Sequence, residues 1–206
     1  MQLDERALRE QVTVQLKYKS RNPVIGYLTD RFLRAIVHVV EEVSPPTILD
    51  VGCGEGIVAT VLTRQFPDVG YFGCDIHEPS VRLAASAPGG KARFLLGDAV
   101  RLPFPDRSFE LVICSETLEH LRDYRGALAE LVRVSAGTVL ITVPHEPFWR
   151  LGNILRGKYL RSLGNTPEHV NHWTRRGITA LVSSCFERIQ VRPVFPWVFV
   201  ICWKDG

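Results

Sequence analysis

The stretch TILDVGCGEG, from Thr47 to Gly56, decides the fold of this 206-residue chain. It begins with an apolar run that ends at Val51, and glycines follow at positions 52, 54 and 56. A short apolar run bounded by glycine predicts a buried strand, and the glycines permit the tight turn that joins a strand to a helix. Such a turn lets a nucleotide-like ligand lie close to bare backbone.

The charges around these glycines narrow down the ligand. Asp50 stands two residues before Gly52, and Glu55 lies inside the loop. Both carboxylates repel a pyrophosphate and attract a ligand that carries an amino group and a sulfonium. The G-x-G-x-G spacing also differs from the G-x-G-x-x-G of dinucleotide sites. We therefore expect S-adenosylmethionine, rather than NAD or FAD, as the ligand of this loop.

Size and composition fit one soluble domain, with 46% apolar and 23% charged residues. The net charge of +3 is too small to indicate a nucleic-acid partner, and none is expected. The longest apolar runs, 35–40 and 194–203, fall short of the ~20 residues that a transmembrane helix needs. The charged N-terminus is unlike a secretory signal. A cytoplasmic location is expected, and the oligomeric state stays open.

Strand-like and helix-like segments alternate along the chain, which predicts parallel βαβ units. The last two strands are separated only by Arg192-Pro193 and should form an antiparallel hairpin at one edge of the sheet. The predicted fold is α/β, a Rossmann-like, doubly wound seven-stranded sheet that is mostly parallel, with helices on both faces. The expected strands are 47–51, 70–74, 92–96, 110–114, 138–143, 188–191 and 194–203, and the expected helices are 27–43, 56–65, 79–87, 124–134 and 174–185.

A single domain spanning 1–206 is expected, in four parts. An N-terminal helical cap (1–46) precedes the cofactor-binding core (47–143), and a C-terminal helix and hairpin (173–206) closes the chain. Between them, the segment 144–172 has no clear period and is far longer than an ordinary connection of ~2–6 residues. It also follows the carboxyl end of a strand, where open α/β sheets bind ligands. We therefore expect this insertion to be a lid over the substrate.

Acidic residues close the second and third predicted strands. Asp75 follows the run Tyr71–Cys74, and Asp98 follows Leu96-Gly97. A carboxylate at the end of the second strand can accept both ribose hydroxyls, and one after the third can accept from an adenine amino group. Enzymes that bind dinucleotides also use an acidic residue at the end of the second strand. The alternative for Asp75 is a turn residue that is exposed to solvent.

In combination, these motifs resemble the class I S-adenosylmethionine-dependent methyltransferases, and among them the small type-11-like enzymes. The resemblance rests on LDVGCGEG, Asp75, GDA at 97–99, the run LPFPDRSFELV at 102–112 and the ExLEHL at 116–121, and it covers roughly 47–143. Glu110 departs from the family pattern, which more often has Asp there. The resemblance implies that the methionine end is held by Asp50, Gly52, Cys53, Gly54 and Gly56, the ribose by Asp75 and Ile76, and the adenine by Asp98 and Ala99, with Ser115 beside the sulfonium.

The run Glu116-Thr117-Leu118-Glu119-His120 carries a narrower resemblance. Its spacing places Glu116, Glu119 and His120 on one face of a helical turn, which suits a divalent metal. Metal-dependent ubiquinone-pathway O-methyltransferases and small-RNA 2′-O-methyltransferases have a similar run and a later histidine, which implies His169 as a further ligand. A metal would lower the pKa of an acceptor hydroxyl. The alternative is structural, with Glu119 a helix-end charge and His120 packed beside the cofactor or acting as a base.

The acceptor site is expected to lie around the lid. The lid has more basic than acidic residues, which suits an anionic small-molecule substrate, and a solvated basic face is the alternative. A histidine can act as general base toward a hydroxyl, and aromatic residues can line an acceptor pocket or anchor the lid to the core. The candidates are His120, His145 and His172 for catalysis and Tyr18, Trp149, Tyr159 and Trp173 for substrate binding, with Tyr18 otherwise in an exposed linker.

The expected reaction is transfer of a methyl group from S-adenosylmethionine to a small-molecule acceptor through in-line displacement, and a hydroxyl is the expected acceptor group. The absence of an N/D-P-P-Y segment argues against methylation of amide or base nitrogens. Two other functions remain. An NAD-dependent oxidoreductase is disfavoured by Asp50 and by the glycine spacing, whereas a non-catalytic cofactor-binding module that regulates a partner would keep the same loop.

Overall fold

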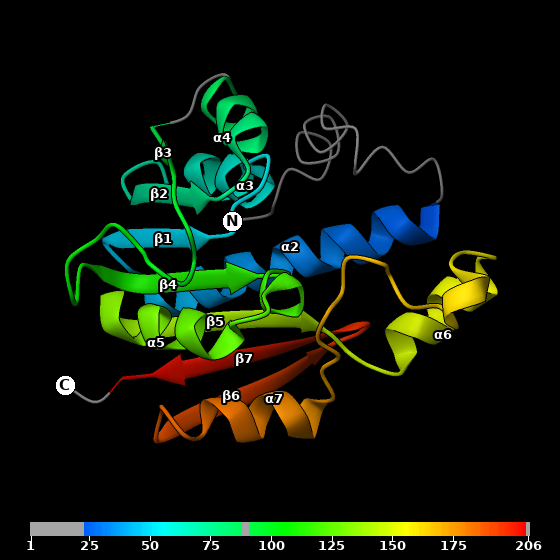
Figure 1. The fold of residues 1–206 in the computed structure, drawn as a ribbon. Coiled ribbons are helices and arrows are strands. Elements are labelled where there is room, and N and C mark those ends of the chain that lie inside the picture. The colour runs from blue at the N-terminus through cyan, green and yellow to red at the C-terminus, as the bar shows by residue number, and fades with distance from the viewer. Residues whose placement is uncertain (1–22, 88–90, 205–206) are drawn as a thin grey trace.

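Seven strands form one mixed sheet in the order β3-β2-β1-β4-β5-β7-β6 (Figure 1). The computed structural model describes residues 23–87 and 91–204. Strands β1 to β5 run parallel, and β7 is antiparallel to both of its neighbours. The strands are β1 (Thr47–Val51), β2 (Gly70–Asp75), β3 (Arg93–Leu96), β4 (Phe109–Ser115), β5 (Ser135–Pro144), β6 (Arg188–Val194) and β7 (Trp197–Trp203).

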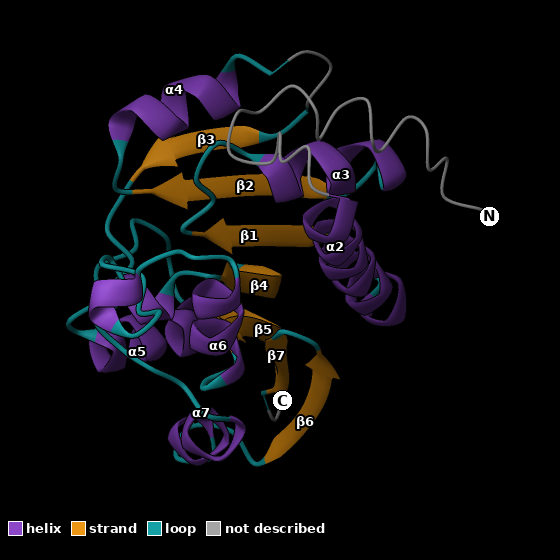
Figure 2. Cartoon of the chain, turned by 90° about the vertical axis from the view of Figure 1, so that its right-hand side faces the viewer, coloured by secondary structure: helices purple, strands orange, loops and turns teal. Residues whose placement is uncertain are grey.

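Helices cover both faces of this sheet, as the sequence predicts (Figure 2). Helices α2 and α3 lie on one face, and α5 and α7 lie on the other. Alternate residues of β4 serve the two layers: Leu111 and Ile113 pack toward α2 and α3, and Val112 and Cys114 pack toward α5 and α7. The helices are α2 (Pro23–Val43), α3 (Ile57–Gln65), α4 (Glu78–Ala85), α5 (Tyr124–Val134), α6 (Phe148–Leu155) and α7 (Arg175–Val182), with 3₁₀ turns η2 (Leu118–His120) and η3 (Leu160–Ser162).

The C-terminal hairpin is confirmed, but its turn lies three residues later than predicted. Val194 pairs with Trp197, so the turn is Phe195-Pro196 and not Arg192-Pro193. Pro193 therefore belongs to β6, which is the edge strand of the sheet. An edge strand tolerates proline because one of its sides has no ladder hydrogen bonds to make.

The chain changes direction across the sheet between β1 and β4. From β1 to β3 the strands are added toward one edge of the sheet, whereas β4 and β5 are added on the other side of β1. The loops that follow β1 and β4 therefore diverge, which leaves space at the carboxyl edge between these two strands. The glycine loop follows β1, and Ser115 ends β4, so this switch point brings both to one place.

The sequence of 144–172 shows no clear period, yet this segment contains α6 and η3. Helix α6 begins directly after Pro147, a residue that favours the start of a helix. We call this segment the lid. Across the described residues, no helix is both long enough and apolar enough to span a bilayer.

Candidate functional site

The glycine loop after β1 has backbone geometry that its neighbours enforce. Gly52, Gly54 and Gly56 all have positive φ angles, of 75°, 51° and 77°. A Cβ on Gly52 would collide with the side chain of Thr117, and a Cβ on Gly56 would lie 2.9 Å from the Cβ of Ala84. By contrast, a Cβ on Gly54 would meet no described atom within 4 Å. Gly54 therefore faces open space, as a ligand contact would require.

Asp75 ties this loop to the end of β2. One of its carboxylate oxygens accepts from the backbone N–H of Gly54 at 2.8 Å, and the other accepts from that of His77 at 2.8 Å. Each oxygen keeps a further lone pair for a ligand hydroxyl. The neighbouring Ile76 is 68% exposed, so its side chain is free to cover a bound ring.

Asp98 and Ala99 occupy the turn after β3, at the same edge of the sheet. The carboxylate of Asp98 accepts from the N–H of Val100 at 3.1 Å, in a turn closed by an Asp98–Arg101 bridge. Ala99 is buried. The two residues that are predicted to bind adenine are therefore held in place by their own turn rather than by a distant part of the chain.

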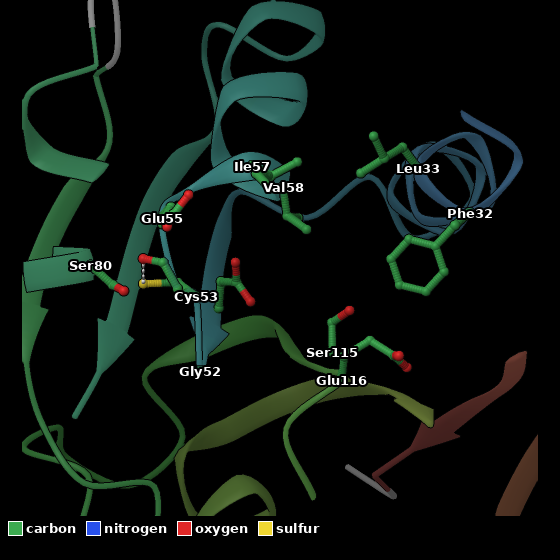
Figure 3. A pocket seen from close by; sticks show the side chains of 12 residues that line it. Phe32, Leu33, Gly52, Cys53, Glu55, Ile57, Val58, Ser80, Ser115 and Glu116 are labelled. Atoms are coloured by element: carbon green, nitrogen blue, oxygen red, sulfur yellow. Dashed lines mark hydrogen bonds between the residues drawn. The ribbon is translucent and has the colours of Figure 1, made fainter. Parts of the chain in front are cut away.

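A cavity lies at the switch point, bounded by the glycine loop, the start of α3, the end of β4, α2 and α4 (Figure 3). Ser115 and Glu116 face it from below the loop, and Phe32 and Leu33 close it from α2. Its twelve lining residues are Phe32, Leu33, Asp50, Gly52, Cys53, Gly54, Glu55, Ile57, Val58, Ser80, Ser115 and Glu116.

Asp50 is a buried carboxyl in the wall of this cavity, with 1% of its surface exposed. It accepts a hydrogen bond from the hydroxyl of Tyr71 at 2.6 Å. Burial raises the pKa of Asp50 to about 7; the Tyr71 hydrogen bond opposes this rise, and the charge of Asp75 adds to it. Asp50 is therefore poised to ionise when a cation enters the cavity.

Glu116 does not lie on a helical turn with Glu119, which corrects the prediction from spacing. Its φ angle is 52°, so the chain reverses at Glu116 and only Leu118–His120 is helical. Its carboxylate accepts from Trp197 Nε1 at 2.8 Å and from Thr142 Oγ1 at 3.5 Å. Burial raises the pKa of Glu116 above its ordinary value, and these two hydrogen bonds oppose the rise.

Glu119, His120 and His169 form a second cluster, in which one ligand atom from each lies within 4.8 Å of the others. Glu119 is 1% exposed, and neither carboxylate oxygen has a hydrogen-bond partner among the described residues. His120 Nδ1 lies 2.9 Å from the carbonyl oxygen of Glu168, which fixes its ring. Burial, together with the charges of His120 and His172, lowers the pKa of His169 to about 4. The cluster does not include Glu116.

The other candidate histidines lie apart from the lining of the cavity. His172 Nδ1 is 3.7 Å from a carboxylate oxygen of the buried Glu146, and the His145 ring packs against Phe148. None of the twelve residues around the cavity is a histidine.

The tryptophan candidates in and beside the lid contact other aromatic side chains of the chain. Trp149 stacks on His169 and packs against Trp197, and Trp173 packs edge-on against Tyr124. Tyr159 is 42% exposed. Tyr18 lies outside the described residues.

Sequence reasoning missed several residues in and around the cavity, among them Phe32, Leu33, Thr142 and Trp197. Phe32 and Leu33 read only as the buried stripe of α2, and Thr142 reads as one residue of an apolar strand. Trp197 reaches Glu116 across 81 positions of sequence. No local pattern signals a contact of that range.

The comparisons with known proteins decide the family. A family model described as a methyltransferase domain matches residues 49–141, from β1 to β5. The demethylmenaquinone methyltransferase of Thermus thermophilus is 33% identical over 154 residues, which are 71% of this chain and 70% of that protein. This chain belongs to the S-adenosylmethionine-dependent methyltransferases. The predicted family and enzyme class are confirmed.

Solved structures place this methyltransferase in the same fold. The YcgJ protein of Bacillus subtilis superposes with a TM-score of 0.56 at 29% identity, over 71% of this chain and 62% of that one. The magnesium protoporphyrin IX methyltransferase of Synechocystis, solved with bound SAH, gives 0.70 at 14% identity, over 97% and 94%. At that identity the likeness concerns the fold alone, and it confirms the predicted sheet.

Proposed function

We propose that this methyltransferase transfers the methyl group of S-adenosylmethionine to a hydroxyl of a small molecule. One observation carries the proposal: the carboxylate of Glu116 and the glycine loop line the same cavity. A buried carboxylate beside the cofactor gives the hydroxyl proton a destination. The O-methyltransferase rstn1 of Aspergillus nomiae, 34% identical over 55% of this chain, is a relative whose name specifies transfer to oxygen.

In this proposal, the cavity and the adjoining turns hold the cofactor along the carboxyl edge of the sheet. The methionine end occupies the loop of Gly52, Cys53, Gly54 and Gly56, where N–H groups at the start of α3 meet its carboxylate and Asp50 faces its ammonium. The ribose binds at Asp75 and Ile76, the adenine at Asp98 and Ala99, and the sulfonium beside Ser115. We assign 47–143 to cofactor binding and 144–172 to covering the acceptor, within one domain.

Glu116 is then the general base of the reaction. The acceptor oxygen forms a bond to the methyl carbon while the carbon–sulfur bond breaks, which leaves S-adenosylhomocysteine. The hydroxyl proton passes to the carboxylate of Glu116. We prefer Glu116 to His120, His145 and His172 because it lines the cavity and they do not. The hydrogen bond from Trp197 fixes the direction of the carboxylate.

Two measurements test this function. Calorimetry should show binding of S-adenosylmethionine and none of NAD, and methyl-labelled cofactor should label a member of a panel of phenols and alcohols. The substitution Glu116→Gln should lower that turnover by roughly 100-fold or more, since general base catalysis contributes about 10²–10⁴-fold. Cofactor affinity should stay within about twofold.

The same measurements separate the alternatives. Cofactor binding with no turnover across oxygen, nitrogen and carbon acceptors would favour a non-catalytic module. Transfer to nitrogen alone, unaffected by Glu116→Gln, would overturn the assignment of a hydroxyl acceptor.

A divalent metal at Glu119, His120 and His169 is a second part of the proposal. The residues fit such an ion because Glu119 is buried with both oxygens unpartnered, a costly state that a cation would relieve. When bound, a metal would supply Lewis-acid activation of an acceptor hydroxyl. Metal analysis of the purified protein, with Glu119→Gln and His169→Ala as variants and His77→Ala as a matched control, tests occupancy directly. Equal metal content in all four proteins would rule the site out.

A further inference from the structure

The lid carries an exposed apolar surface that the proposed reaction does not use. Phe148, Leu151 and Leu155 recur at helical spacing along one side of α6 and are 45%, 51% and 79% exposed. Leu160 and Leu163 follow in and after η3, with exposures of 57% and 69%. We call these five residues the lid patch.

Helix α6 turns Trp149 and Asn153 toward the rest of the chain and leaves the lid patch outward. A surface helix ordinarily buries its apolar stripe, yet the one buried residue of α6 is Asn153, 2% exposed. Asn153 Nδ2 donates to the carbonyl oxygen of Gly164 at 2.9 Å, and Arg150 Nε donates to that of Leu163 at 3.1 Å. These bonds fold the η3 turn back on α6 and leave the leucines facing away.

Positive charge surrounds the patch. Arg150, Arg156, Lys158 and Arg161 lie within or beside it, and the sequence has no acidic residue between Glu146 and Glu168. In the part of the chain that the structure describes, none of the four cations forms an ion pair with a carboxylate. A helix with an exposed apolar side and flanking Lys and Arg has the character of one that lies in the interface of an anionic membrane.

We propose that the lid patch docks this protein on the surface of an anionic lipid bilayer. The leucines and Phe148 enter the boundary between headgroups and acyl chains, and the four cations meet lipid phosphates. Helix α6 lies beyond the end of the sheet toward which β4 and β5 point (Figure 1), where its Trp149 packs against Trp197 of β7. Docking there turns the carboxyl edge of the sheet, with its cavity, toward the lipid. The inference holds whether or not the acceptor is a hydroxyl.

Vesicle co-sedimentation of the full chain tests this docking. The protein should sediment with vesicles of phosphatidylcholine and phosphatidylglycerol, and much less with phosphatidylcholine alone. The variant Leu151→Glu/Leu155→Glu should weaken binding by roughly tenfold or more, since it removes the apolar contact. The variant Lys158→Glu/Arg161→Glu should weaken it by roughly fivefold for each cation removed.

Matched controls and a second readout keep the test decisive. Leu83→Glu and Lys91→Glu change exposed residues elsewhere and should bind as the parent does. Circular dichroism should show that every variant is folded, since the substituted side chains are exposed. Binding of the parent to neither vesicle, or equal binding by parent and lid variants, would overturn the proposal. So would a dimer that Leu151→Glu/Leu155→Glu dissociates in the absence of vesicle binding, because the patch would then join two copies.

Discussion

At the scale of single residues, the three loop positions are occupied by glycine for different physical reasons. Gly52 is required by the side chain of Thr117, and Gly56 by the approach of Ala84 on α4. Only Gly54 has open space around its missing side chain, and its N–H is held by Asp75. A motif that reads as one ligand signature thus contains two positions set by packing and one position that faces open space.

Asp50 gives a residue-scale prediction about pH. Its folded pKa of about 7 lies above the unfolded value of 3.8, so the unfolded chain loses this proton first as pH rises. As pH rises between those two values, ionisation of Asp50 in the unfolded chain therefore lowers the free energy of unfolding. Asp50→Asn should remove this loss, so its stability advantage over the parent should grow by roughly 2–3 kcal/mol between about pH 5 and about pH 8. Urea unfolding of both proteins at each pH measures it; parallel curves would contradict the raised pKa.

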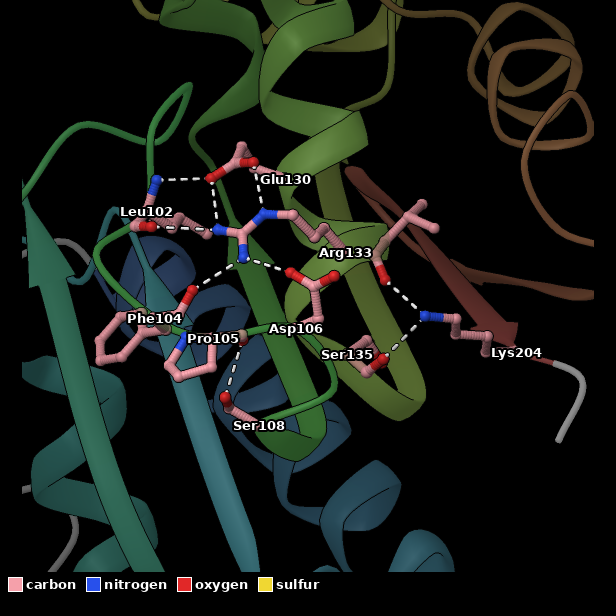
Figure 4. Close-up of polar contacts among 10 residues, drawn as sticks. Leu102, Phe104, Pro105, Asp106, Ser108, Glu130, Arg133, Ser135 and Lys204 are labelled. Atoms are coloured by element: carbon pink, nitrogen blue, oxygen red, sulfur yellow. Dashed lines mark hydrogen bonds and ion pairs between the residues drawn. The ribbon is translucent and has the colours of Figure 1, made fainter.

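At the scale of elements, Arg133 of α5 ties the loop before β4 to the helix (Figure 4). Its guanidinium donates to the carbonyl oxygens of Leu102 and Phe104 at 3.0 and 2.8 Å, and it pairs with Glu130 and Asp106. Five N–H donors in one plane allow a single side chain to hold the whole bend.

Loss of this side chain should destabilise the protein more than loss of an ordinary surface ion pair. Arg133→Ala should cost about 1–3 kcal/mol, because two backbone carbonyls and Glu130 lose their donor; the partial exposure of the arginine keeps the figure this low. Arg82→Ala, which breaks only the exposed pair with Glu78, should cost under about 0.5 kcal/mol. Chemical denaturation of the two variants compares them, and equal losses would refute the role of the backbone contacts.

Strand β7 reaches the proposed base through Trp197. The substitution Trp197→Phe keeps an aromatic ring beside Phe32 and Trp149 but removes the N–H that donates to Glu116. Because that bond lowers the pKa of Glu116, its loss should move the rising limb of the pH–rate profile upward by about one pH unit. Trp203→Phe, at the other end of β7, is the control. An unmoved profile for Trp197→Phe would show that Glu116 is not the base.

At the scale of the whole molecule, cofactor binding should stabilise the fold. A ligand at about 100 times its Kd adds ~2.7 kcal/mol, which corresponds to a rise of roughly 5–10 °C in Tm for a domain of this size. Differential scanning fluorimetry with S-adenosylmethionine should show this shift, and NAD at equal concentration should not. A shift with NAD alone would be incompatible with the proposed site.

Local patterns in the sequence predict most of the fold because they depend on near neighbours. The run 110–114 is found as β4 (Phe109–Ser115), and Asp75 does end β2. The hairpin turn was misplaced because proline reads as a turn residue, whereas an edge strand accepts Pro193. The surroundings of Glu116 could not be predicted, since its reversed backbone and its bond to Trp197 arise only in the assembled sheet.

The position of β7 has a consequence for biosynthesis. β7 pairs with β5 on one side and β6 on the other, although it follows both in the chain. On the ribosome, the flank of β5 therefore stays bare until the hairpin has emerged, and a bare flank recruits strands from other nascent chains. A fragment ending before Trp197 would expose this flank permanently, and it should collect in inclusion bodies or on chaperones.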